Sequence, residues 1–297
     1  MSESERAIDG SDAVATMLDV LDLDSSAART REDIFTGTSH QMPTGRIFGG
    51  QVLAQAIVAA DRTTPDDRVP HSMHGYFLRP GDASKGVTLS VDRIHDGRSF
   101  STRRTQAYQD GVPIFSMIAS FEHEDPGLDH QHPMPQGVIS PEEARRLQSG
   151  VDRHPLSQRL LSESAIEVLH ADGALYGGEP TTPQPRQCVW MRTRRPIGDD
   201  PAVHRAALAY MSDLTIQEPV LRAHGLTWSE PGLKVASLDH AMWWHRPARV
   251  DEWLLYAQES PSARGGRGLA TGRLYTRGGE LVASVAQEIM IRVPAAT

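Results

Sequence analysis

Three polar residues interrupt apolar patterns in the second half of the chain, and together they could hold a water molecule for hydrolysis. Residues 281–291 alternate with a period of two, and Gln287 is the only polar member of its apolar row. Asp213 follows an apolar helical pattern, and Ser237 shares a strand face with Val235. A carboxylate can accept a proton from water, while a hydroxyl and an amide can orient it. Asp213, Ser237 and Gln287 are therefore the candidate catalytic residues.

Each of these residues also has a purely structural explanation. Gln287 could bond a neighbouring loop, Asp213 could cap or interrupt a helix, and strand serines commonly bond the backbone. A shared role is favoured by the matching row of the first half, 115–121, which is apolar and has Ala119 where the second half has Gln287. We expect all three polar residues to be missing from the matching positions of the first half.

Other kinds of reactive site have less support. No serine lies in a Gly-x-Ser-x-Gly pattern, and the single cysteine, Cys188, has no activating residues beside it, so a covalent nucleophile is not expected. The pairs His71 with His74 and His240 with His245 are spaced so that each pair points to opposite faces of a strand. The sequence therefore predicts no metal site.

The elements that must position the candidate residues occur twice along the chain. A glycine-led helix ending near Pro65 and a helix from Val203 to about Val220 are each followed by predicted strands, over 69–122 and 232–293. Turns are predicted at 110–111, 265–268 and 278–279. Similar residues recur at offsets of 167 or 168 positions, which indicates an internal duplication. Each copy is predicted to be one helix against an antiparallel sheet, an α+β arrangement.

This duplication predicts three segments. Residues 1–125 form an N-terminal unit, 126–185 a connecting linker, and 186–297 a C-terminal unit that carries the candidate catalytic residues. The linker loses periodicity and is rich in Pro, Gly and Ser, with one helix predicted over 140–148. We expect it to cross the surface and to cover little of the core.

Composition excludes several classes of function. The 297 residues are 39% hydrophobic and 23% charged, which is typical of a globular protein. A net charge of -8 argues against nucleic acid as a partner. The sequence lacks a signal peptide and an apolar run long enough to span a membrane, and its single cysteine suits a reducing compartment. A cytoplasmic protein without a membrane partner is expected.

Three strings give the chain a specific resemblance. They are Gly-Gly-Gln-Val-Leu at 49–53, Tyr-Phe-Leu-Arg-Pro at 76–80 and Asp-His-Ala-Met-Trp-Trp-His-Arg-Pro at 239–247. Over about residues 34–292 the chain resembles the type II acyl-CoA thioesterases, the TesB family of double hot-dog enzymes. The resemblance implies two fused hot-dog units, each a long helix packed on an antiparallel sheet.

The resemblance also implies an activity and a site. Asp213, Ser237 and Gln287 match the residues that hold the hydrolytic water, which attacks the thioester of a fatty acyl-CoA and releases a fatty acid and CoA. No cofactor or metal is implied, and a homodimer or homotetramer is expected. Candidate substrate-binding residues are Gly50, whose amide opens the first helix and could bind an oxyanion, and His74, which could line the same cavity.

Two other functions stay open at this point. An enoyl-CoA hydratase-like hot-dog enzyme would use an Asp and His pair on the helix, and His224 is distant from Asp213 in sequence. A non-catalytic acyl-CoA binding protein would need no water-holding residues. The presence of all three polar residues in one half favours the hydrolase.

Overall fold

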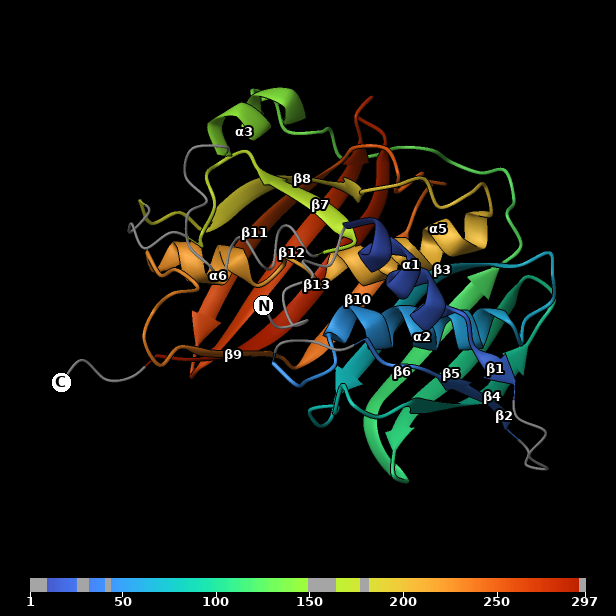
Figure 1. Ribbon diagram of the computed structural model, residues 1–297. Helices are drawn as coiled ribbons and strands as arrows, with labels where there is room; N and C mark the ends of the chain where they lie inside the picture. The colour runs from blue at the N-terminus through green and yellow to red at the C-terminus, as the bar shows by residue number, and fades with distance from the viewer. Residues whose placement is uncertain (1–9, 26–31, 41–43, 149–163, 177–181, 294–297) are drawn as a thin grey trace.

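One antiparallel sheet runs through both halves of the molecule (Figure 1). The structure is a computed structural model and describes residues 10–25, 32–40, 44–148, 164–176 and 182–293. Its strands are β1 (Asp24–Ser25), β2 (Asp33–Gly37), β3 (Val69–Phe77), β4 (Val87–Asp96), β5 (Phe100–Gln109), β6 (Val112–Glu122), β7 (Ile166–His170), β8 (Arg186–Thr193), β9 (Lys234–Ser237), β10 (Asp239–Trp244), β11 (Leu254–Arg264), β12 (Arg267–Thr276) and β13 (Leu281–Arg292).

The strand order shows the internal duplication. The strands lie in the order β1-β2-β4-β5-β6-β3-β10-β13-β12-β11-β8-β7, with β9 paired to β13. From the centre outward, β3, β6, β5 and β4 on one side match β10, β13, β12 and β11 on the other. The halves join where β3 pairs with β10, with Met73 opposite Met242. The predicted α+β double hot-dog fold is confirmed.

The helices are α1 (Gly10–Leu21), α2 (Gly49–Asp61), α3 (Pro141–Gln148), α5 (Pro201–Ser212) and α6 (Glu218–Ala223). Helices α2 and α5 pack against each other, and α1 packs against α2. The interiors of both units form one hydrophobic cluster, in which the alanines of α2 and α5 allow close approach of the two helices. Within the described ranges, no helix is long and apolar enough to cross a membrane.

The single helix predicted from Val203 to about Val220 is wrong, because the structure divides it. Helix α5 ends at Ser212 and α6 begins at Glu218, with Pro219 in its first turn. A proline there has no N–H to continue the α5 hydrogen-bond ladder, and its ring would clash with the preceding turn. Asp213 consequently occupies the C-cap of α5.

The stretch 126–185 does not merely cross the surface, as its composition suggested. Strand β7 pairs with β8 and extends the sheet, with Leu169 opposite Trp190. Both side chains belong to a second hydrophobic cluster on the outer side of the C-terminal unit, which also includes Trp253 and, from α3, Ala144. Figure 1 shows α3 and β7 lying over the β8 side of the sheet. Part of this stretch therefore covers core; residues 149–163 and 177–181 lie outside the described residues.

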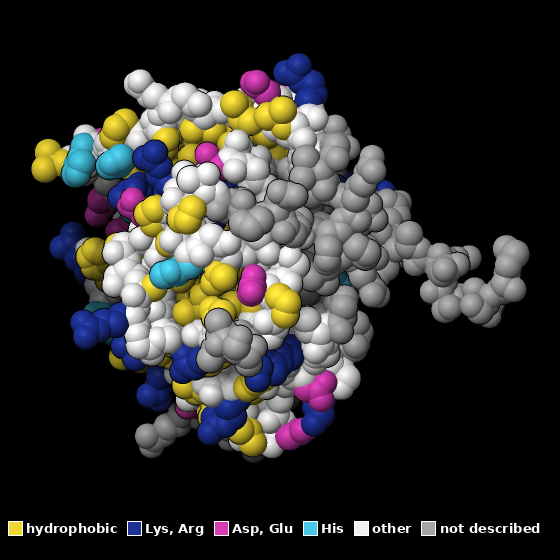
Figure 2. All heavy atoms as spheres, turned by 90° about the vertical axis from the view of Figure 1, so that its left-hand side faces the viewer, with side chains coloured by type: hydrophobic (Ala, Val, Ile, Leu, Met, Phe, Trp, Pro, Cys, Tyr) yellow, Lys and Arg dark blue, Asp and Glu magenta, His cyan; other side chains and the backbone are white. Residues whose placement is uncertain are grey.

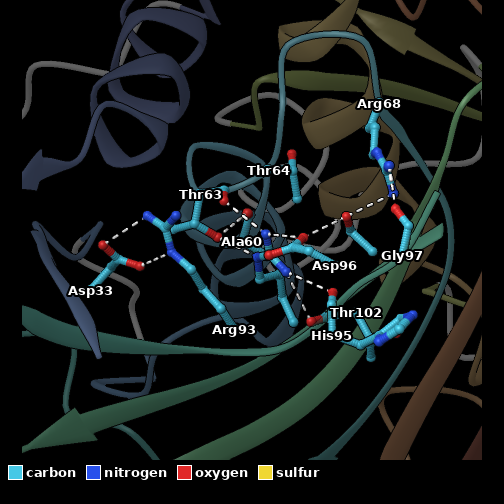
Figure 3. Close-up of polar contacts among 12 residues, drawn as sticks. Asp33, Ala60, Thr63, Thr64, Arg68, Arg93, His95, Asp96, Gly97 and Thr102 are labelled. Atoms are coloured by element: carbon cyan, nitrogen blue, oxygen red, sulfur yellow. Dashed lines mark hydrogen bonds and ion pairs between the residues drawn. The ribbon is translucent and has the colours of Figure 1, made fainter. Parts of the chain in front are cut away.

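A buried arginine fastens the end of α2 to the sheet, and Figure 3 labels Ala60, Thr63 and Asp96 of this network. Arg103 of β5 has no exposed surface, and its Nε donates to the Thr63 hydroxyl at 2.9 Å. That hydroxyl donates in turn to the Ala60 carbonyl of the last α2 turn at 2.8 Å. The guanidinium also bonds the Thr63 carbonyl at 2.9 Å and the Asp96 carboxylate at 2.7 Å. Because a buried guanidinium is costly unless it is paired, these bonds fix the loop that follows α2.

Replacing Arg103 by Met should lower the free energy of unfolding by about 3 kcal/mol, because Thr63 and Asp96 lose a buried partner. Urea denaturation followed by circular dichroism measures this change. The matched control is Arg104→Met on the same strand, which removes a half-exposed pair with Asp92 and should cost about 0–1 kcal/mol. Equal losses for both variants would contradict the role given to Arg103.

Candidate active site

A cavity of about 510 Å³ lies between the start of α2 and strand β9. Its polar side chains include Asp213, Gln217 and Ser237. Much of the remaining wall is apolar, and it includes Ile47, Phe48, Phe77, Phe115, Leu214 and Val235. Figure 2 shows the side of the molecule that carries β9 and α6, with hydrophobic side chains gathered near the middle of the surface and Lys and Arg side chains beside them. An apolar cavity with few polar groups is typical of a site for an amphipathic small molecule.

Two of the three candidate catalytic side chains, Asp213 and Ser237, line this cavity, and the third, Gln287, is buried behind Ser237. The Ser237 hydroxyl lies 3.4 Å from Oδ1 of Asp213, and Nε2 of Gln287 lies 2.9 Å from the same hydroxyl. They come from three elements: the cap of α5, the end of β9 and the middle of β13. Strand β9 pairs with β13 and puts Ser237 opposite Ile289, two positions from Gln287. The residues are therefore assembled by strand register and by the end of a helix.

Asp213 is almost completely buried, and burial raises its pKa to about 7. Hydrogen bonds from Gln287, the Gly50 amide and Ser237 act in the opposite direction, because they favour the charged form. The carboxyl group can therefore both accept and release a proton near neutral pH, as a general base must.

The Gly-Gly start of α2 allows this close approach. A Cβ on Gly49 would lie 2.6 Å from the Asp213 carboxylate, and one on Gly50 would lie 2.3 Å from the Tyr210 carbonyl. Only glycine fits at either position. Gly49 lines the cavity, whereas Gly50 is buried beside it, where its backbone amide lowers the pKa of Asp213. A role of Gly50 in substrate binding stays a prediction.

His74 is not brought to the cavity. Its neighbour Met73 points into the core, whereas the His74 side chain is 49% exposed and lies 2.9 Å from an Asp239 carboxylate oxygen on β10. Neighbouring strand residues point to opposite faces of a sheet, so His74 lies on the outer face. Within the described ranges, no three His, Cys, Asp or Glu side chains converge as metal ligands would.

Gln217 is a site residue that sequence reasoning missed. It lies just before α6, and its Nε2 donates to the Ser237 hydroxyl at 2.9 Å. With donors on both sides, Ser237 has only its own proton left to give, and Asp213 is the acceptor within reach. The sequence signal was Pro219, which ends the α5 pattern and starts a new helix beside the candidate carboxylate.

A buried carboxylate holds Gln217 in place. Its neighbour Glu218 is fully buried and accepts four hydrogen bonds, listed here by donor: His170 Nε2 at 2.7 Å, Gln187 Nε2 at 2.8 Å, Tyr176 OH at 3.1 Å and Trp228 Nε1 at 3.2 Å. Burial alone would raise the pKa of Glu218, but His170, Gln187 and Trp228 outweigh it and the pKa is lowered. Since His170 belongs to β7, the stretch 126–185 helps to support the site.

The expectation that all three polar residues are missing from the first half is wrong for Asp213. Asp61 and Asp213 each lie twelve positions after the first residue of their helix. Asp61 faces a matching cavity of about 480 Å³ at the start of α5, and burial raises its pKa. The strand positions that match the other two residues differ, however. Pro70, opposite Phe121, takes the position that Ser237 takes opposite Ile289. Ala119 takes the position of Gln287. The first half retains the carboxylate without the hydroxyl and amide.

Comparison with known proteins gives consistent matches along the chain. Residues 38–122 match the family model described as the acyl-CoA thioesterase N-terminal domain, and residues 173–290 match the one described as acyl-CoA thioesterase. Human acyl-coenzyme A thioesterase 8 is 37% identical, covering 94% of this chain and 89% of that protein. Acyl-CoA thioesterase 2 of Haemophilus influenzae is 36% identical, covering 87% of this chain and 92% of that protein.

Solved structures agree. The acyl-CoA thioesterase II TesB2 of Mycobacterium marinum is 41% identical, with a TM-score of 0.75, and covers 94% of this chain and 99% of its own. A tesB protein of Mycobacterium avium subs paratuberculosis is 32% identical with a TM-score of 0.76 and the same coverage.

The raised pKa of Asp213 predicts a pH-dependent cost to stability. Between about pH 4, the usual Asp pKa, and pH 7, the folded protein retains a proton that the unfolded chain has lost. The stability of the native protein should then fall relative to Asp213→Asn by up to about 1.4 kcal/mol per pH unit, and the difference should level off above pH 7. Urea denaturation across pH 4–8 measures it, with Asp66→Asn on an exposed turn as control. A difference independent of pH would refute the raised pKa.

Proposed function

Because this chain belongs to the acyl-CoA thioesterase family, we propose that it hydrolyses fatty acyl-CoA to a free fatty acid and CoA, with a water molecule held by Asp213, Ser237 and Gln287. The observation that carries the proposal is the buried Asp213 carboxylate, with a hydroxyl 3.4 Å away, on the wall of an apolar cavity. The apolar wall suits an acyl chain, and the carboxylate suits a water that must lose a proton.

In the proposed reaction, water attacks the thioester carbonyl directly. Asp213 accepts a proton as the new carbon–oxygen bond forms, and the carbonyl oxygen becomes an oxyanion. When the carbon–sulfur bond breaks, the proton on Asp213 passes to the leaving CoA sulfur. Ser237 is oriented by Gln287 and Gln217, and its own proton is directed at Asp213, so it acts as an orienting group rather than as a nucleophile.

The start of α2 is the proposed oxyanion site. The first amides of a helix have no partner within the helix and carry positive potential. The Gly50 amide bonds Asp213 in its charged form. Once Asp213 accepts the proton from water and loses its charge, it attracts the Gly50 amide less strongly. The amide can then donate a hydrogen bond to the oxyanion. Arg46 and Arg79 lie on the cavity wall, where they could meet the phosphates of CoA.

The observed contacts give the hydratase alternative no support. His224 follows α6 as its C-cap residue, several residues beyond Asp213. His240 does contact one of the three candidate catalytic residues, but its ring nitrogens contact Gln287 and Ser212 rather than Asp213. Among the residues that the structure describes, no contact favours a second reaction over hydrolysis.

A homodimer or homotetramer is also part of the proposal. Tyr76, Ile118 and Trp243 are 53%, 52% and 43% exposed on the adjoining strands β3, β6 and β10. A group of exposed large apolar side chains on a sheet face is typical of an association surface. Sedimentation equilibrium should show a dimer or tetramer, and Trp243→Glu should shift it toward monomer while circular dichroism stays unchanged. A native monomer would contradict this surface.

The function is tested with a panel of saturated acyl-CoA esters of increasing length, followed by free-thiol release. The native protein should release CoA, with a rate that rises to about pH 7 and is constant above it, because Asp213 must be ionised. Asp213→Asn should reduce kcat about a hundredfold to ten-thousandfold. The control Asp61→Asn changes the matching carboxylate of the first half and should leave kcat unchanged.

Two results would contradict the proposal. Hydration of an enoyl-CoA without thiol release would favour the hydratase, and binding of acyl-CoA without either reaction would favour a non-catalytic binding protein. Unchanged thiol release by Asp213→Asn would place the chemistry elsewhere in the protein.

A further inference from the structure

A buried chain of hydrogen bonds runs behind Asp213, and it passes through a histidine that the mechanism above does not use. His240 of β10 has no exposed surface. Its Nδ1 contacts the amide oxygen of Gln287, and its Nε2 lies 2.9 Å from the Ser212 hydroxyl. Gln287 continues the chain to Ser237. The chain thus connects the last residue of α5 to the cavity through β10 and β13.

The charge on Asp213 sets the direction of these hydrogen bonds. A carboxylate can only accept, so the Ser237 hydroxyl gives its proton to Asp213. That hydroxyl accepts from the NH2 group of Gln287, which also favours the charged form of Asp213. The amide oxygen of Gln287 must then point away from the cavity, toward His240, where only a donor can satisfy it.

His240 can be this donor as a neutral ring. Burial lowers the pKa of His240 to about 4, so the ring carries one proton at neutral pH. With that proton on Nδ1, the ring donates to Gln287, and Nε2 accepts the single Ser212 hydroxyl proton at 2.9 Å. That proton is then directed at His240 instead of at the Ala209 carbonyl, which lies 2.8 Å from the same hydroxyl. A proton on Nε2 instead would require the Gln287 amide to turn over. Its oxygen would then face the Asp213 carboxylate, and two acceptors repel.

The first half shows that the sheet itself needs no such pair. In the antiparallel pair of β10 and β13, Ala241 lies opposite Ala286. The next pair in this register is His240 with Gln287. In the first half the corresponding cross-strand pair is Met73 with Ala119, and both side chains are buried. A polar pair at this position therefore belongs to the half that carries the complete set of site residues.

We propose that His240 is a positioning residue, whose Nδ1–H holds the Gln287 amide with its NH2 group toward Ser237 and Asp213. The inference rests on the proposed function, in which Gln287 orients the water-holding groups. His240 is buried and does not line the cavity, so its effect on the reaction passes through Gln287.

Two substitutions separate the hydrogen bond from the packing. His240→Met copies Met73 and removes the donor, which should lower kcat about tenfold, the equivalent of one misplaced hydrogen bond, with little change in KM. His240→Asn keeps an N–H near the position of Nδ1 and should retain most of kcat, while the Ser212 proton, released from His240, can turn to the Ala209 carbonyl at 2.8 Å. A loss of kcat in both variants, with unchanged melting temperatures, would overturn the role of the Nδ1 proton.

The decisive measurement is a double-mutant cycle on thiol release. Gln287→Ala alone should lower kcat, and adding His240→Met should cost nothing more, because the residue acts through Gln287. The double variant reproduces the Met73–Ala119 pair of the first half, so it should fold. If His240→Met lowers kcat tenfold both in the native protein and in the Gln287→Ala variant, the inference fails while the proposed function stands. If Gln287→Ala and Asp213→Asn both keep the native kcat, the proposed function itself fails.

A readout that is independent of activity completes the test. Nitrogen-15 spectra of the histidine-labelled protein distinguish the Nδ1–H tautomer from the Nε2–H tautomer, and the His240 signals are identified by their absence in His240→Asn. The Nδ1–H tautomer is expected in the native protein at neutral pH. An Nε2–H tautomer or a charged ring would overturn the proposed direction of the chain.

Discussion

The antiparallel pairing of β3 with β10 is the interaction on which the rest of the structure depends. It joins two half-sheets into one, and it brings the helices of the two units together in opposite directions. The start of α2 then meets the end of α5, and the start of α5 meets the end of α2. Neither unit could supply the site alone, because the Gly50 amide comes from one unit and Asp213 from the other.

This symmetry creates two similar places, and the side chains decide that they differ. Both have a carboxylate at a helix end, Asp213, which is buried, and Asp61, which is half-buried. The start of α2 consists of glycines, whereas α5 begins with Pro201, which has no N–H, and the Asp200 side chain already bonds the amide of Ala202 at 2.8 Å. The first helix amides can consequently reach Asp213 and a ligand at the start of α2, whereas those at the start of α5 are missing or already bonded.

The site is held by two buried polar systems that approach it from different sides. The Glu218 carboxylate fixes the turn after α5 through four donors, and His240 and Gln287 approach from the sheet. A buried polar group without a hydrogen-bond partner lowers the free energy of unfolding by about 1–3 kcal/mol. Each of the two groups of hydrogen bonds therefore stabilises the fold only when all its donors and acceptors are paired. The same bonds that satisfy these groups also fix the donors around Ser237 and Asp213.

Periodicity and turn chemistry are local properties, and they were enough to predict the repeated helix and sheet, the hairpin at 110–111 and the three polar residues that interrupt apolar rows. The sequence could not show that α5 stops at Ser212 or that β7 joins the sheet, since both depend on distant partners. Gln217, Asp61 and the contacts of His240 were likewise decided by the tertiary structure. Which polar group meets which depends on strand register and on the crossing of two helices, and these are set only when residues far apart in the chain pack together.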